Sequence, residues 1–194
     1  NTSALLDTAF SKLKAACSED GKVSASALDS HQLISYDLSL SWAECTAARF
    51  SLQHACRLEE SARDDLVTEL AALFTAESVN NTLARLRARP TDYGLSRQQI
   101  DAVSDAPAAE SFLARNLAAE HLGALGASVL DRDGDLGPDL LGEHHSMMRD
   151  TFRRVTDEIV APLAEEIHRE DLDIPDEILN PLKEMGLFGL SIPE

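Results

Sequence analysis

Residues that could bind a metal ion are grouped near the middle of the chain, in the stretch DRDGDLGPDLLGE. Aspartates occur there at alternate positions, as in the first half of an EF-hand calcium loop: Asp131, Asp133 and Asp135. Such a loop also needs Gly at its sixth position and a bidentate Glu at its twelfth, but Leu136 and Gly142 stand there. Three glycines and Pro138 are typical of a turn-rich connector, so we interpret residues 129–142 as a linker.

The other residues with catalytic potential do not combine into a recognisable site. His144 and His145 are adjacent, so on a helix they point about 100° apart and do not readily share one metal ion. His54 and His121 lie in predicted helices without a Ser or Cys plus acid arrangement typical of a nucleophilic triad. The acidic run after the histidine pair is interpreted as a solvated helix face: Glu165, Glu166, Glu170, Asp171 and Asp173. No GxGxxG or GxxxxGK(S/T) phosphate loop is present, and we assign no catalytic, cofactor-binding or metal-ligating residue.

The composition predicts an all-α protein that does not bind nucleic acid or an anionic membrane surface. Apolar residues make up 44% of the 194 residues and aromatic residues only 5%, so Leu, Ala, Val and Ile must build most of the core. Ala and Leu are also the best helix formers, and residues that favour strands are sparse. The net charge of −17 opposes binding to nucleic acid and to an anionic membrane surface, because both need clustered Lys and Arg.

The cysteines and the absence of long apolar runs predict a cytoplasmic protein. Cys17, Cys45 and Cys56 are odd in number and form no CxxC pair, so neither a disulfide framework nor a zinc site is indicated. Cys45 and Cys56 share a helical face with Leu and Trp, and we expect buried thiols in a reducing compartment. No apolar run reaches the roughly 18 residues of a membrane span, and the first residues do not resemble a signal peptide.

Helical periodicity predicts a bundle-like module over residues 1–128. Long helices are expected from Thr2 to about Gly21, from about Ser26 to Leu58 and from about Arg63 to Arg87. Their apolar stripes are Leu5, Leu6, Ala9, Phe10, Leu13 and Ala16 or Cys17; Leu38, Trp42, Cys45, Ala48, Leu52 and Cys56; and Leu66, Leu70, Leu73, Ala76, Val79, Leu83 and Leu86. Arg85, Arg87 and Arg89 close the third helix and complement its dipole. A short helix, a break at Pro107 and a further helix to about Leu122 follow, and a module of this size should fold alone.

Residues 143–194 predict a second, smaller helical segment. Its apolar positions are Met148, Phe152, Val155, Ile159, Leu163 and Ile167. Pro162 lies inside this pattern and should kink the helix, because proline lacks an N–H and crowds the preceding turn. Pro175 should open a final helix, which Pro181 should perturb unless Pro181 lies in a new first turn.

This second segment resembles the beginning of the acyl-CoA dehydrogenase family. The pieces that carry the resemblance are Val160-Ala161-Pro162-Leu163-Ala164, Glu166-Ile167, Pro175, Met185-Gly186-Leu187-Phe188-Gly189-Leu190 and Ile192-Pro193-Glu194, with His168 where the family usually has Asp. The resemblance implies an FAD-dependent oxidoreductase acting on an acyl-CoA thioester. It also implies that the catalytic glutamate and most FAD-binding groups lie in later regions of the family's chains, so these 194 residues alone should not be catalytic.

The first module resembles the C-terminal helical bundle of the same family. A bundle placed before the dehydrogenase start is similar to the arrangement in the branch of the family that acts on methylsuccinyl-CoA in the ethylmalonyl-CoA pathway. That likeness implies α,β-desaturation of (2S)-methylsuccinyl-CoA to mesaconyl-CoA, electron-transfer flavoprotein as electron acceptor and a homodimer. We expect Leu38, Trp42, Leu70 and Phe74 to help the added bundle cover the surface through which the family's dimers pair into tetramers. The alternative is a non-catalytic helical scaffold or partner-binding module.

Overall fold

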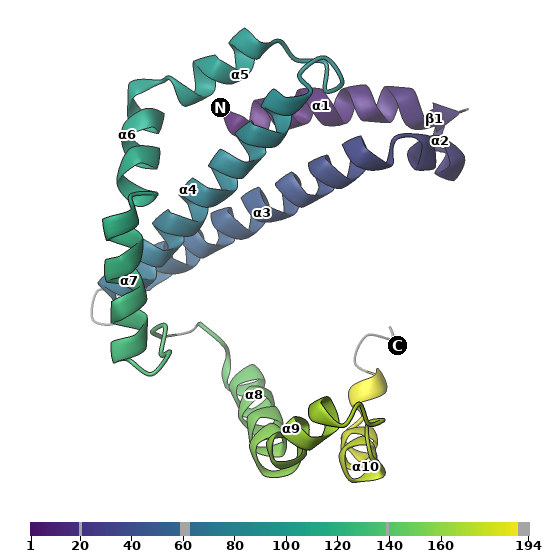
Figure 1. The fold of residues 1–194 in the computed structure, drawn as a ribbon, viewed down its shortest axis with the longest axis vertical. Helices are drawn as coiled ribbons and strands as arrows, with labels where there is room; N and C mark the ends of the chain where they lie inside the picture. The colour runs from purple at the N-terminus through teal and green to yellow at the C-terminus, as the bar shows by residue number, and fades with distance from the viewer. Residues whose placement is uncertain (20, 59–62, 139, 190–194) are drawn as a thin grey trace. The chain divides into compact units, whose positions relative to one another are not determined.

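The structure is a computed structural model that describes residues 1–19, 21–58, 63–138 and 140–189. It confirms the predicted all-α fold, since the described residues are mainly helical (Figure 1). The strands among them form one hairpin of two short strands, each two residues long. The chain divides into two compact units, Asn1–Pro138 and Asp139–Glu194, which are described separately.

Unit 1 is built on three helices. They are α1 (Thr2–Cys17), α3 (Gln32–Arg57) and α4 (Asp65–Ala88), with α3 and α4 packed along their length and α1 packed against both (Figure 1). The hairpin of β1 (Ser18–Glu19) and β2 (Lys22–Val23) and the short helix α2 (Ala25–Ser30) join α1 to α3. Three shorter helices follow α4: α5 (Arg97–Ser104), α6 (Pro107–Asn116) and α7 (Ala119–Asp131).

Side-chain caps set several helix boundaries that periodicity alone misses. The predicted continuous helix from Ser26 to Leu58 is wrong, because the chain breaks at His31 between α2 and α3. Ser24 caps the start of α2, and the His31 ring lies 2.8 Å from the carbonyl oxygen of Ala27 at its end. These contacts satisfy terminal backbone groups and make α2 a separate helix.

The core of unit 1 lies where α1 meets α3, α4 and the segment after α4. The buried cluster comprises Leu5, Leu6, Ala9, Leu13, Cys17, Leu38, Leu83, Leu86, Tyr93, Leu95 and Ile100. The predicted stripe of α1 is thereby confirmed, with Cys17 buried and Phe10 partly buried. A smaller buried cluster lies at the other end of α3 and α4: Ala55, Leu58, Val67 and Ala71.

The predicted stripe of α3 is correct only in part. Leu38 and Ala48 are buried, but Trp42, Leu52 and Cys56 are exposed. The buried face is completed instead by small or polar residues, among them Ser41 and Ala55. Small side chains let α4 approach α3 closely, so the wider residues lie at the edges of the contact.

Residues after α7 continue to contact unit 1, within the stretch predicted as a linker. Arg132 forms an ion pair with Asp64 at the start of α4, and the His54 ring lies 3.1 Å from the carbonyl oxygen of Pro138. Gly137 has φ +103°, and a Cβ atom there would lie 2.6 Å from a methyl group of Val67. Only glycine therefore fits this close approach without strain.

Unit 2 contains α8 (Glu143–Val155), a π-helical turn (Thr156–Val160), α9 (Ala161–Arg169), α10 (Asp176–Glu184) and a 3-10 turn (Leu187–Gly189). The perturbation expected at Pro162 is this π turn, in which the N–H of Ala161 donates to the carbonyl of Thr156. The Pro162 ring would crowd the carbonyl four residues before it, at Glu158, and the wider turn relieves that contact. Helix α10 follows Pro175 as predicted and is not divided at Pro181.

Candidate functional site

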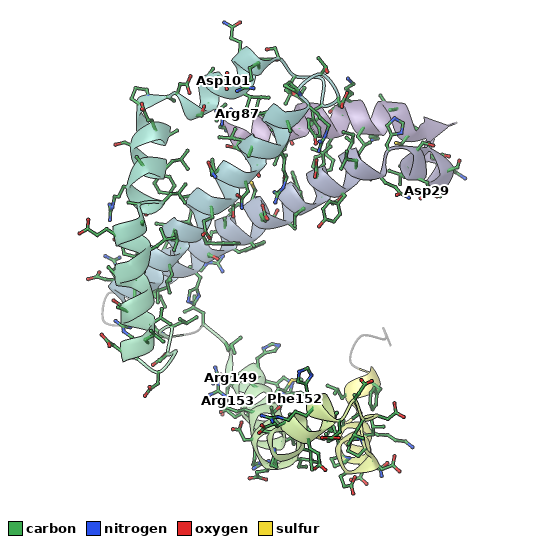
Figure 2. The ribbon with its side chains drawn as sticks, in the orientation of Figure 1. Asp29, Arg87, Asp101, Arg149, Phe152 and Arg153 are labelled. Atoms are coloured by element: carbon green, nitrogen blue, oxygen red, sulfur yellow. The ribbon has the colours of Figure 1, made fainter. Side chains whose placement is uncertain are left out.

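The arginines that close α4 each bind a carboxylate from another part of unit 1. Arg85 makes a bidentate contact with Glu44 of α3, at 2.6 and 3.0 Å. Arg87 donates to Asp101 of α5 at 2.9 Å, and Figure 2 shows these two side chains between α4 and α5. Arg89 donates to Asp37 of α3 at 2.5 Å. The predicted role in helix-end electrostatics is therefore accompanied by tertiary ion pairs that fasten α4 to α3 and α5.

Asp37 has the most buried carboxylate of the three ion pairs, with its side chain 12% exposed. Its carboxylate also accepts a hydrogen bond of 2.8 Å from the hydroxyl of Tyr93, whose side chain is fully buried. Burial, and then the hydrogen bond to the Asp37 carboxylate, raise the pKa of Tyr93 to about 12. The hydrogen bond to Asp37 raises the pKa of Arg89 as well, so this guanidinium stays charged. The neutral Tyr93 and the Arg89–Asp37 ion pair hold the helices together. Because these groups do not change their protonation near neutral pH, they are poor proton-transfer groups.

A second polar cluster joins α4 to α6 and α7. Glu69 accepts a hydrogen bond of 2.8 Å from Arg115, and its other carboxylate oxygen lies 3.5 Å from the Nε2 atom of His121. Asn116 is buried and donates to the carbonyl of Phe112 at 2.8 Å, which leaves its side-chain oxygen buried without a partner. An adjacent open hollow of about 340 Å³ is lined by residues that include Glu69, Arg115 and Asn116.

The structure thus brings an acid next to His121, which sequence reasoning did not foresee. The spacing of residues in the sequence could not have indicated this pair, since Glu69 and His121 lie in separate helices. Unpaired polar atoms beside a hollow are the usual setting of an ordered water molecule, and we interpret the cluster in that way.

The residues of unit 2 that could do chemistry are arranged as surface groups. The rings of His144 and His145 meet edge to face with centroids 5.8 Å apart. In the acidic run, Glu165 forms an exposed ion pair of 2.6 Å with Arg169, one helical turn later. Within the described ranges, no group of three or more His, Cys, Asp or Glu side chains could hold a metal ion.

The four residues expected to cover a partner surface do not share one environment. Leu38 is 1% exposed and belongs to the core of unit 1, so its predicted surface role is wrong. Trp42 is half-exposed and packs edge-on against Phe10, with ring centroids 5.6 Å apart. Leu70 and Phe74 are partly buried on α4. The prediction that Cys56 is buried is also wrong, whereas Cys45 is partly buried and its sulfur lies 3.5 Å from the hydroxyl of Thr82.

The three arginines that close α4 do not offer a binding site for a flavin dinucleotide. Its pyrophosphate would need unpaired cations or a glycine-rich helix start. The guanidinium groups of Arg85, Arg87 and Arg89 are instead bound to carboxylates. Among the described helices, none is both long and apolar enough to cross a bilayer.

Comparisons with known proteins show what the chain is similar to. Residues 142–194 match the family model described as the acyl-CoA dehydrogenase N-terminal domain. The chain is also similar to (2S)-methylsuccinyl-CoA dehydrogenase of Cereibacter sphaeroides, with 36% identity over 210 residues. That alignment covers 98% of this chain and 36% of the relative, so the chain spans about a third of the relative's length. Of the motif pieces that predicted the family, Leu190 and residues 192–194 lie outside the described residues, and the others lie in unit 2. The predicted resemblance to the N-terminal part of the acyl-CoA dehydrogenase family is therefore supported, and residues 142–194 carry its N-terminal domain.

Proposed function

We propose that the protein containing this chain is an FAD-dependent acyl-CoA dehydrogenase that desaturates (2S)-methylsuccinyl-CoA to mesaconyl-CoA. The observation that carries this proposal is the extent of the similarity. The family model covers residues 142–194, but the alignment with the methylsuccinyl-CoA enzyme covers 98% of the chain and so includes unit 1. A shared helical unit outside the common family domain supports a relationship to that particular enzyme.

We assign the flavin chemistry to parts of the protein other than units 1 and 2. When bound, FAD would supply the redox chemistry by accepting a hydride from the substrate. We assign the cofactor and the base that removes the α-proton to these other parts, since the arginines that close α4 are already bound to carboxylates. Unit 1 contributes a preformed helical scaffold, tied together by the Asp37–Arg89–Tyr93 contact. We further propose a cytoplasmic homodimer that passes electrons to electron-transfer flavoprotein.

The test uses the full-length protein, purified with its cofactor. We expect flavin absorbance that is bleached under anaerobic conditions by (2S)-methylsuccinyl-CoA, with a product two hydrogens lighter by mass spectrometry. Succinyl-CoA, which keeps the second carboxylate but lacks the methyl branch, and butyryl-CoA, which lacks both, serve as matched controls. Bleaching by butyryl-CoA alone would retain the family and refute the substrate. A colourless protein that no acyl-CoA alters would refute the enzyme and favour the helical scaffold.

A further inference from the structure

An open hollow of about 560 Å³ lies between α1 and α3 of unit 1, and its lining residues take part in none of the ion pairs described above. Small-molecule sites are hollows of this size in which an apolar or aromatic surface carries a few polar groups. The lining has this composition: Asp7, Phe10, Ser11 and Lys14 of α1, and Ser39 and Trp42 of α3.

Two perpendicular aromatic rings line this hollow. The ring planes of Phe10 and Trp42 stand at 88° to each other, with centroids 5.6 Å apart. Trp42 is 49% exposed, so much of the indole surface is open to a ligand. The face of an aromatic ring attracts cations, and Trp is the most effective of the aromatic side chains. Aromatic side chains grouped in this way favour a methylated ammonium, whose methyl groups also gain apolar contact.

Two charges of opposite sign line the same hollow and are not neutralised by the protein. Within the described ranges, the side chains of Asp7 and Lys14 have no hydrogen-bond or ion-pair partner. Seven residues of α1 separate their Cα atoms by about 10 Å, and the long Lys14 side chain can span part of that distance because helical side chains lean towards the N-terminus. A chain of net charge −17 repels a free anion, whereas a ligand with a positive and a negative end has no net charge and can use both groups.

We propose that this hollow binds a small zwitterion that carries a methylated ammonium group at one end and a carboxylate at the other. The methylated ammonium lies against Phe10 and Trp42 with Asp7 as its counter-ion, and the ligand's carboxylate pairs with Lys14. Because Asp7 and Lys14 are exposed, solvent screens both contacts, and we expect a dissociation constant of about 1 mM. The inference does not depend on the proposed activity, because neither flavin nor an acyl-CoA takes part.

Fluorescence of Trp42, the single tryptophan, reports on binding directly, because the indole lines the hollow. The 194-residue chain is titrated with 4-(trimethylammonio)butanoate at constant ionic strength, and the change should saturate with a dissociation constant of about 1 mM. In 5,5-dimethylhexanoate a carbon atom replaces the nitrogen and removes the positive charge, so this ligand should bind at least about tenfold more weakly. Tetramethylammonium, which lacks the carboxylate, should bind about threefold more weakly.

Matched variants test the two charges. Asp7→Asn should weaken binding of 4-(trimethylammonio)butanoate about five- to tenfold, and Lys14→Gln about threefold. Asp29→Asn and Lys22→Gln, the same changes at exposed positions outside the hollow, should bind as the wild type does. All four positions are exposed, so every variant should keep the wild-type circular dichroism spectrum.

Three outcomes would overturn the proposal. The absence of a saturable change up to about 20 mM would show that the hollow does not bind such a zwitterion. Equal affinity for 5,5-dimethylhexanoate would show that the hollow selects apolar surface and not positive charge. Wild-type affinity in both Asp7→Asn and Lys14→Gln would show that the ligand binds elsewhere.

Discussion

The hydroxyl of Tyr93 should contribute measurably to the stability of unit 1 and make that stability fall in alkali. Tyr93→Phe keeps the buried ring and removes the hydrogen bond to Asp37. A hydrogen bond to a charged group contributes about 1.5–3 kcal/mol. The rise in the pKa of Tyr93 to about 12 is a separate quantity, because burial is its larger cause; it governs how stability falls in alkali and not the loss at pH 8. From the hydrogen bond we expect Tyr93→Phe to lower the free energy of unfolding by about 1.5–3 kcal/mol at pH 8.

The pH dependence follows from the direction of the shift. Folding favours the protonated phenol, so its contribution is fully present below pH 10 and is lost as the pH rises towards 12. Wild-type unfolding free energy should fall over this window, and that of Tyr93→Phe should fall less. The two curves should converge near pH 12.

Urea unfolding followed by the fluorescence of Trp42, the single tryptophan, reports on unit 1. The matched control is Tyr36→Phe, because Tyr36 is two-thirds exposed and should leave both the free energy and its pH dependence unchanged. Equal unfolding free energies for the wild type and Tyr93→Phe at pH 8, or parallel curves up to pH 12, would contradict the assigned contact.

Three further predictions concern packing and exposure. In urea unfolding, Gly137→Ala should lower the free energy of unfolding of unit 1 by about 3 kcal/mol, and Gly134→Ala should lower it by about 1 kcal/mol. Both glycines have positive φ, but only a Cβ atom at residue 137 would meet a neighbouring methyl group. Equal losses of free energy would argue against the packing of residue 137. Leu83→Ala should cost about 2–5 kcal/mol by the same measurement, whereas Leu130→Ala, at a position 78% exposed, should change stability by less than about 0.5 kcal/mol. Cys56 should react with a thiol reagent much faster than the other cysteines, and Cys56→Ser should remove the fast phase; a fast phase that survives would show that another thiol is accessible.

The apolar spacing of the sequence predicted α1 well but α3 less well, for a physical reason. Helix α1 buries one stripe, so its period identifies the buried residues directly. Helix α3 carries apolar residues on its buried face, at its edges and along its outer face, so periodicity alone cannot choose among them. Burial of Ser41 and exposure of Trp42 depend on how closely α4 approaches, which is a tertiary property.

The polar contacts could not be predicted from local sequence. Arg89 and Asp37 are 52 positions apart, and Tyr93 and Asp37 are 56 apart. Arginine at a helix end is explained adequately by the helix dipole, so nothing in the sequence requires a distant carboxylate. The family resemblance, in contrast, rests on contiguous residues around Pro162 and Gly186, and such a pattern is visible without a structure.

The π turn at Thr156–Val160 explains how unit 2 can carry six apolar residues at unusually wide spacing. Met148 and Ile167 are 19 positions apart, and at about 100° per residue a regular α-helix would rotate one about 100° away from the other. One extra residue accommodated in a wide turn cancels that rotation and returns both to the same side. Deleting a single residue from the turn should therefore keep Met148 and Ile167 on the same side, whereas deleting two should turn Ile167 away from Met148.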